Sequence, residues 1–258
     1  MSEKLDPSHA GRKPSIHPHF EGLTRDWVEG RLPLDYREEK SELGEGTNGA
    51  ELWLALHGYQ QTGAYLFEKL KPVLREGQTL ISPNAPFPVP MKEPSGKYRL
   101  GFSWYFYNPD NDAYFIDMEI AIHSMVALIS KKGLEHTPKR IIGFSQGGYL
   151  APFLAERLKN VIQVIGVGAE VLGQELMAQP GGWSPSYRVD AVHGAEDPIV
   201  KLDRSRRSFE QAQWREGKKV FEGEYCEIPQ MGHGLKESGM LELRRLLRVP
   251  VPGSDGVS

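Results

Sequence analysis

From residue 50 onward, continuous apolar runs alternate with segments in which apolar positions recur at the period of a helix. Runs that are apolar at every position are typical of parallel strands buried on both faces of a sheet. Four such runs predict central strands, at residues 52–56, 79–81, 140–144 and 161–167. Residues 187–192 and 219–228 are further predicted strands, and the polar interruptions in the second favour a place nearer an edge.

The segments between these runs carry their apolar residues on one helical face. Steps of 3, 4, 3 and 4 predict one helix that covers the sheet and ends at Gly133, with its apolar face made by Phe115, Met118, Ile122, Met125 and Ile129. Similar patterns predict helices at residues 64–76, 146–159, 202–216 and 236–247; Gly77 follows the first of these and Gly217 the third. This alternation predicts an α/β sandwich, in which helices cover both faces of a mostly parallel central sheet.

The two ends of the chain differ in composition from the part between them. Residues 1–18 and 249–258 are rich in proline, glycine, serine and charge, so we interpret them as flexible tails. Residues 19–248 contain no linker long enough to separate two cores, which favours a single domain. Within it, the extended and partly alternating residues 27–37 favour an antiparallel hairpin arm that leads into the sheet.

Composition and charge exclude several classes of protein. The chain is 39% hydrophobic and 25% charged, which is ordinary globular composition. Its formal charge of −3 argues against nucleic acid as a partner. The single cysteine, Cys226, cannot form an internal disulfide, and no apolar stretch has the length of a signal peptide or a membrane span. We therefore expect a cytoplasmic protein.

A G-x-S-x-G pattern lies where the strand predicted at 140–144 meets the next helix. A serine in this context stands on a sharp turn and can act as a nucleophile. Side chains in place of Gly143 and Gly147 would collide with the neighbouring strand and helix. Ser145 is therefore the candidate nucleophile, and an ordinary helix-capping serine is the alternative.

A serine needs a neighbouring base, because its hydroxyl is a poor nucleophile at neutral pH. Of the eight histidines, His233 is the candidate, because it follows the last predicted strand in a loop flanked by glycines. The alternative is a histidine of a surface loop.

The base in turn needs a carboxylate that orients its imidazole. Asp197 follows the strand predicted at 187–192, and Pro198 favours an extended backbone that projects the carboxylate. Glu170, after the strand predicted at 161–167, is the alternative acid. The resulting chain order of Ser, Asp and His differs from the orders of chymotrypsin and subtilisin.

The turn after the first core strand opens a predicted helix. Backbone N–H groups at the start of a helix point outward and can bind an oxyanion. We therefore expect two oxyanion donors, the N–H of Tyr59 in this turn and the N–H of Gln146 directly after Ser145. His57 is interpreted as a structural hydrogen-bonding residue, with a catalytic role as the alternative.

Four segments of the chain resemble the motif blocks of the phospholipase/carboxylesterase family of α/β-hydrolases, which includes acyl-protein thioesterases and small bacterial esterases. They are LHGYQQTG at 56–63, GFSQGG at 143–148, HGAEDPIV at 193–200 and MGH at 231–233. The resemblance extends to PNAP at 83–86 and SWY at 103–105, and it covers about residues 50–247. It implies an α/β-hydrolase fold and the same triad of Ser145, Asp197 and His233.

The chain departs from the family at two positions. Gln60 stands where members often have glycine, which puts the shape of the oxyanion loop in question. Pro152 lies inside the helix predicted after Ser145 and is expected to kink it, because proline lacks a backbone donor.

Residues 102–107 are unusually aromatic, which fits either core packing or a wall beside the scissile ester. The candidate pocket residues are Gln60, Trp104, Tyr105 and, in a glycine-rich segment that resembles a flap, Trp183.

The leading hypothesis is a serine carboxylesterase that cleaves small carboxylic esters through an acyl-enzyme. An acyl thioesterase or lysophospholipase with the same triad is the alternative, and a non-catalytic α/β-hydrolase-like binding protein is the distant one. No residues have the spacing of a metal site, so we expect neither a metal nor another cofactor.

Overall fold

The central element of the protein is a seven-stranded sheet with the strand order β14-β11-β10-β9-β3-β4-β2. The computed structural model describes residues 15–16, 33–42, 50–110, 113–179 and 182–247. Six strands run parallel, and β2 (Tyr36–Lys40) pairs antiparallel with β4 at one edge. The parallel strands are β3 (Glu51–Leu56), β4 (Gln78–Pro83), β9 (Lys139–Phe144), β10 (Val161–Val167), β11 (Arg188–Gly194) and β14 (Tyr225–Ile228).

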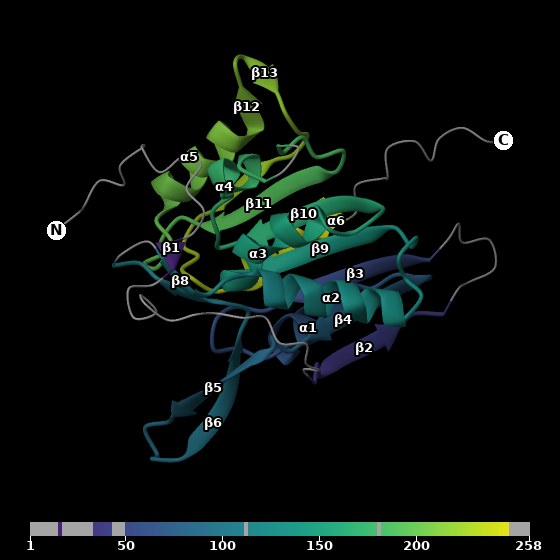
Figure 1. Ribbon diagram of the computed structural model, residues 1–258, viewed down its shortest axis with the longest axis vertical. Coiled ribbons are helices and arrows are strands. Elements are labelled where there is room, and N and C mark those ends of the chain that lie inside the picture. The colour runs from purple at the N-terminus through teal and green to yellow at the C-terminus, as the bar shows by residue number, and fades with distance from the viewer. Residues whose placement is uncertain (1–14, 17–32, 43–49, 111–112, 180–181, 248–258) are drawn as a thin grey trace.

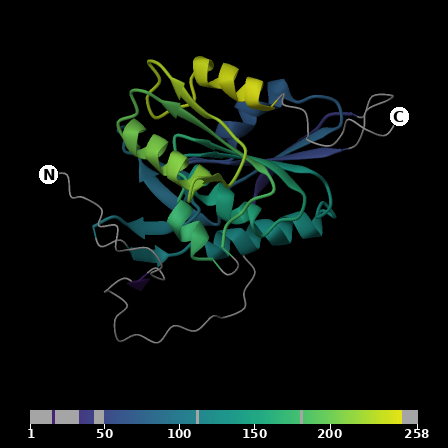
Figure 2. The same cartoon turned by 90° about the horizontal axis from the view of Figure 1, so that it is seen from above.

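Helices cover both faces of this sheet, as the sequence predicts. Figure 2 shows α6 (Glu237–Leu247) and α2 (Glu119–Lys131) on opposite sides. The first face packs against α6 and α1 (Ala64–Leu70). The second packs against α2, α3 (Gln146–Ala155), the short α4 (Gly173–Met177) and α5 (Leu202–Gln213).

The continuous apolar runs are strands buried on both faces. In β3, Leu52 and Leu54 belong to one core, whereas Trp53 and Ala55 belong to the other. Because neighbouring side chains of a strand point to opposite faces, every position must be apolar. The prediction of central strands is therefore confirmed. The predicted strand at 219–228 is shorter than expected: β14 covers its last four residues and lies at the sheet edge.

The start of α2 differs from the prediction. Phe115 lies in β8 (Ala113–Ile116), and α2 begins only at Glu119, whose N–H donates to the Asp117 carboxylate at 3.0 Å. The end of α2 is as predicted, with Gly133 at a φ of +66°.

Gly217 lies in a hairpin turn and does not end a helix. The helix α5 stops at Gln213, and β12 (Trp214–Arg215) then pairs antiparallel with β13 (Lys218–Lys219). Glu216 and Gly217 have φ values of +49° and +74°, the signs that a two-residue type I′ turn requires.

Two other helices have a proline near or inside them, and both end before their predicted ends. After α1 the chain tightens into the 3₁₀ turn Lys71–Val73, with Pro72 in the turn, so this helix is shorter than predicted. In α3 the helix runs through Pro152 and ends at Ala155, also before its predicted end.

Smaller sheets flank the central one. The strands β5 (Phe87–Lys92) and β6 (Tyr98–Ser103) form a hairpin that projects from the body of the molecule (Figure 1). A second small sheet contains β7 (Phe106–Asn108), β8 and β1 (Ser15–Ile16). The apolar pattern of the sequence did not predict either sheet.

Some predictions concern segments outside the described residues. Of the expected N-terminal tail, only Ser15 and Ile16 are described, and they pair in parallel with β8. The C-terminal tail and most of the predicted arm at 27–37 lie outside the described residues. No helix within the described ranges is long and apolar enough to cross a membrane.

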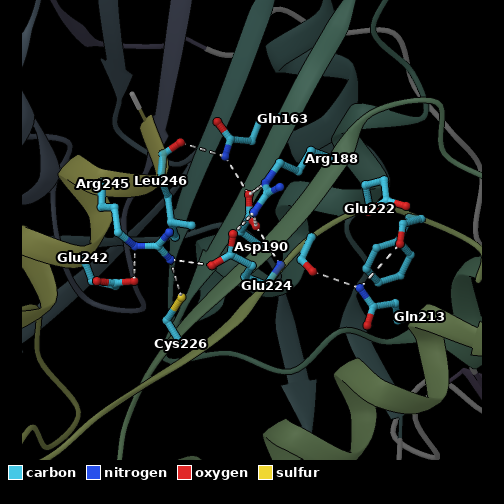
Figure 3. A network of polar contacts seen from close by, with 12 residues as sticks. Gln163, Arg188, Asp190, Gln213, Glu222, Glu224, Cys226, Glu242, Arg245 and Leu246 are labelled. Atoms are coloured by element: carbon cyan, nitrogen blue, oxygen red, sulfur yellow. Dashed lines mark hydrogen bonds and ion pairs between the residues drawn. The ribbon is translucent and has the colours of Figure 1, made fainter. Parts of the chain in front are cut away.

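The amino ends of the strands carry a network of polar side chains, drawn in Figure 3. Asp190 of β11 is fully buried, and its carboxylate accepts hydrogen bonds from Gln163 Nε2 at 2.6 Å, Arg188 Nε at 2.8 Å and the Glu224 N–H at 2.8 Å. Arg188 also pairs with the Glu224 carboxylate at 2.7 Å. At the rim, Arg245 of α6 bridges Glu224 and Glu242, at 2.6 Å in each case.

Candidate active site

Ser145 stands on the sharp turn between β9 and α3. Its backbone has φ 50° and ψ −118°, a conformation that is unfavourable for any residue with a side chain. The Ser145 N–H donates to the carbonyl of Val167, the last residue of β10, at 2.8 Å. The turn thus presents the hydroxyl beyond the carboxyl edge of the sheet, where α/β proteins place their sites.

The two glycines of the G-x-S-x-G pattern are sterically required. A Cβ on Gly143 would lie 2.2 Å from the carbonyl oxygen of Gly147, at the start of α3. A Cβ on Gly147 would lie 2.2 Å from the carbonyl oxygen of Leu56, at the end of β3. Both neighbours are backbone atoms that cannot rotate away, so the predicted collisions with the strand and the helix are confirmed.

The structure brings the three predicted triad residues together. His233 Nε2 lies 2.9 Å from the Ser145 hydroxyl, and His233 Nδ1 lies 2.7 Å from Oδ2 of Asp197. A carboxylate can only accept, so Nδ1 carries the hydrogen and the lone pair of Nε2 faces Ser145. This tautomer can accept the proton of the serine hydroxyl.

Asp197 is held rigidly by its own loop. Its Oδ1 accepts the N–H groups of Ile199 at 2.8 Å and Val200 at 2.9 Å, which leaves Oδ2 for His233. The residue is only 5% exposed. His193 supports the same loop, because its Nε2 donates to the Val200 carbonyl at 2.9 Å.

Glu170, the alternative acid, has other partners. Its carboxylate accepts a hydrogen bond from the Tyr149 hydroxyl at 3.1 Å and pairs with Arg204 Nε at 2.8 Å. Burial and the neighbouring Glu170 charge raise the pKa of the Tyr149 phenol, so this hydroxyl stays a donor. The geometry therefore favours Asp197 over Glu170 as the partner of His233.

The loop of His233 is anchored by residues that the sequence analysis missed. On α1, the Tyr65 hydroxyl accepts the Leu235 N–H at 3.1 Å, and Lys69 Nζ donates to the Leu235 carbonyl at 2.9 Å. Gly168 lies beside the imidazole, and its φ of +59° is in the left-handed region that favours glycine. A glycine directly after β10 was the one available signal, because post-strand positions face the site.

The loop expected to supply the first oxyanion donor lies directly after β3. Tyr59 is 47% exposed, and Gln60 adopts a φ of +61°, in the left-handed region that favours glycine. This conformation explains why a glycine is common at that position in the family the sequence resembles. The second expected donor, the Gln146 N–H, precedes the first helical hydrogen bonds of α3, which run from Gly148 and Tyr149 to Ser145.

His57 holds this loop in place. Its Nδ1 donates to the Gly58 carbonyl at 2.7 Å, and its Nε2 accepts the Ala85 N–H at 2.9 Å, within the PNAP turn. Burial lowers the pKa of His57 to about 4, so the ring is neutral at physiological pH. Both ring nitrogens are engaged in backbone hydrogen bonds, which supports the structural interpretation of this histidine.

The candidate pocket residues occupy different environments. Trp104 is fully buried, and Tyr105 is nearly so. Trp183 is buried against the ring of Phe221 at 5.2 Å between ring centroids, so it is a core residue rather than a flap in this structure. Only Gln60 is partly exposed, and the pocket assignment stays a prediction.

No group of three or more histidine, cysteine, aspartate or glutamate residues within the described part of the chain has an arrangement that could hold a metal ion.

One protein-family model matches most of the chain. The model of the family described as serine hydrolase (FSH1) matches residues 50–222. This range contains Ser145 and Asp197 and ends before His233. A search of curated protein sequences finds no match to the chain.

Solved structures of esterases share the fold. The acyl-protein thioesterase 2 of Zea mays superposes with a TM-score of 0.62 at 15% identity, over 83% of this chain and 97% of that one. Esterase PE8 superposes with a TM-score of 0.61 at 18% identity, over 84% of this chain and 99% of that one. A carboxylesterase from Mesorhizobium loti superposes with a TM-score of 0.60 at 17% identity, over 85% of this chain and 96% of that one. These matches confirm the predicted α/β-hydrolase fold.

Proposed function

This chain belongs to the FSH1 serine hydrolase family, and we propose that it is a carboxylesterase that cleaves small carboxylic esters through an acyl-enzyme on Ser145. The observation that carries the proposal is the hydrogen-bonded row from Ser145 through His233 to Asp197, with distances of 2.9 and 2.7 Å. A strained serine, a base in the correct tautomer and a buried orienting acid are what nucleophilic acyl transfer requires.

The first half-reaction forms the acyl-enzyme. His233 Nε2 takes the proton of the Ser145 hydroxyl while Oγ attacks the ester carbonyl, and the oxyanion of the tetrahedral intermediate accepts hydrogen bonds from the N–H groups of Tyr59 and Gln146. The imidazolium, stabilised by Asp197, then protonates the departing alkoxide. In the second half-reaction His233 activates a water that hydrolyses the acyl-enzyme and restores the free serine.

A thioesterase is the second candidate, because the fold is shared with an acyl-protein thioesterase and the same machinery can expel a thiolate. The two candidates differ only in the leaving group. Turnover of p-nitrophenyl esters of rising chain length, compared with acyl thioesters of the same chains, would rank them by kcat/KM.

The proposal is tested by covalent labelling with a fluorophosphonate probe. We expect one modified residue, Ser145, and loss of both labelling and esterase turnover in Ser145→Ala. The matched control is Ser184→Ala, which removes an exposed serine outside the site. Burial and the adjacent Glu242 raise the pKa of Cys226 to about 12, so this thiol should not compete for the probe. Modification of Cys226 or of another serine would contradict the proposal.

A further inference from the structure

The segment from Gly101 to Tyr105, at the root of the projecting β5–β6 hairpin, contacts both halves of the expected oxyanion hole. We name it the hairpin root. On one side it pairs with the loop of Tyr59: the Phe102 N–H donates to the Gln61 carbonyl, and the Gln60 N–H donates to the Phe102 carbonyl, each at 2.9 Å. The loop is thereby tied to the end of β6 through its backbone.

On the other side the hairpin root ties down the side chain of Gln146. This amide is buried, and its Oε1 accepts the Trp104 N–H at 2.9 Å. Its Nε2 donates to the Tyr105 carbonyl at 2.8 Å and approaches the Ser103 hydroxyl at 3.1 Å. The residue that supplies the second expected oxyanion donor is therefore fixed by the same segment that holds the first.

Two further contacts leave this segment little freedom. The Trp104 indole N–H donates to the carbonyl of His57, the residue that begins the oxyanion loop, at 2.8 Å. A Cβ on Gly101 would lie 2.3 Å from the carbonyl oxygen of Gln60. Only a glycine at this position therefore allows the backbone of β6 to lie so close to the loop.

The loop needs such support, because Gln60 holds a positive φ that a side chain disfavours. A strained conformation persists only where the surrounding structure over-determines it. The spacing of the two donors also matters, because an oxyanion hole works only with donors within about 2.7–3.1 Å of the developing charge.

We propose that the hairpin root is the positioning element of the oxyanion hole, and that the Gln146 side chain is a positioning group that sets the distance between the two donors. The inference rests on the proposed function. Gln146 thus acts in two ways: its backbone N–H binds the oxyanion, and its side chain connects that donor to the loop of the other.

The test is Gln146→Met, which keeps the backbone N–H and the length of the side chain but removes every hydrogen bond of the amide. Loss of one whole oxyanion donor costs about 10²–10³ in kcat, so a displaced donor should cost about 10- to 100-fold. We expect KM to change less than about threefold, because the interaction forms only in the transition state. The apparent pKa values of the pH–rate profile should not move, because the amide does not touch His233.

A trifluoromethyl ketone separates positioning from a general loss of structure. It forms a tetrahedral adduct on Ser145 that places an oxyanion in the hole, so its affinity should fall by the same factor as kcat/KM. Unchanged kcat in Gln146→Met, or a change confined to KM, would overturn the inference.

A second variant tests the loop of the other donor, Tyr59, and keeps the inference testable if Gln146→Met does not fold. Gly101→Ala should displace Gln60 and lower kcat by a similar factor, with the same proportional loss of inhibitor affinity. The matched control is Leu100→Ala, which truncates a half-exposed side chain one residue earlier and should leave kcat within twofold. Equal kcat in Gly101→Ala and Leu100→Ala would contradict the assignment.

Ser145→Ala distinguishes the two levels of proposal. If it keeps its esterase turnover, the proposed function is wrong and the inference falls with it. If it loses turnover while Gln146→Met and Gly101→Ala keep theirs, only the inference is overturned.

Discussion

At the carboxyl ends of the strands, Ser145 and Gln60 hold φ values of +50° and +61°, and the side chains of Ser145, His233 and Asp197 form one hydrogen-bonded row. At the amino ends, Asp190 and Glu224 lie in a network in which each carboxylate has several partners, and none of the residues labelled in Figure 3 has a positive φ. The two regions lie at opposite ends of the same sheet, so the difference reflects what each end does.

Strained backbone costs free energy and is concentrated at functional sites, although turns such as that of Glu216 also contain residues with positive φ. A saturated buried network has the opposite character, because removing one member leaves the others buried without partners. We therefore expect substitutions at the carboxyl end to change kcat, and substitutions at the amino end to change the free energy of unfolding.

The largest expected effect is at Asp197. Asp197→Asn keeps the size of the side chain but presents an amide that favours the wrong imidazole tautomer, so kcat should fall by about 10⁴. Glu170→Gln is the matched control and should cost no more than about tenfold, because Glu170 contacts Tyr149 and Arg204 instead of His233. Steady-state kinetics would check both values of kcat. A large loss of kcat in Glu170→Gln, with a normal kcat in Asp197→Asn, would show that Glu170 is the acid that orients His233.

At the opposite end of the sheet, Asp190→Ala should destabilise the protein by about 3–5 kcal/mol, because Arg188 and Gln163 lose a buried acceptor. Asp190 lies four residues before the end of β11, roughly 13 Å from the carboxyl edge. The kcat of the folded protein should therefore stay within about twofold. Urea unfolding followed by kinetics at low temperature measures both quantities, and a large drop in kcat at unchanged stability would break the contrast between the two ends.

His57 sharpens the comparison, because it lies at the carboxyl end and yet should act on stability. Its pKa falls from 6.5 in the unfolded chain to about 4 in the folded protein. Between these values the unfolded chain takes up a proton that the folded protein excludes. The stabilisation is therefore complete above pH 6.5 and is lost as the pH falls towards 4, by up to about 3 kcal/mol.

Urea unfolding at several pH values between 7 and 4 measures this loss. His57→Gln cannot titrate, so its free energy of unfolding should depend less steeply on pH in this window. Identical slopes for the two proteins would show that His57 does not contribute.

The smallest expected effect is at the rim of the amino-end network. The Arg245 side chain is about half-exposed and pairs with Glu224 and Glu242. Solvent screens such pairs, so Arg245→Met should change the free energy of unfolding by less than about 1 kcal/mol. A loss as large as that of Asp190→Ala would mean that the network acts as one unit out to its rim.

The central sheet and the meeting of the triad residues could be predicted from the sequence. Buried parallel strands must be apolar at every position, and this requirement is visible locally in the runs that became β3, β4, β9 and β10. Because the carboxyl ends of parallel strands share one edge, residues that follow them in the chain also meet in space. Ser145, Asp197 and His233 each follow a strand, so their proximity was implied by chain order.

Only the tertiary structure decided the details between these strands. Asp197 rather than Glu170 contacts His233, Phe115 belongs to a strand, Gly217 makes a hairpin turn, and the β5–β6 hairpin has no equivalent in the apolar pattern. The tie between Gln146 and the hairpin root joins positions about 40 residues apart through one amide. Such contacts depend on which backbone and side-chain groups face each other after folding, and they leave no periodic signal along the chain because each one is made once.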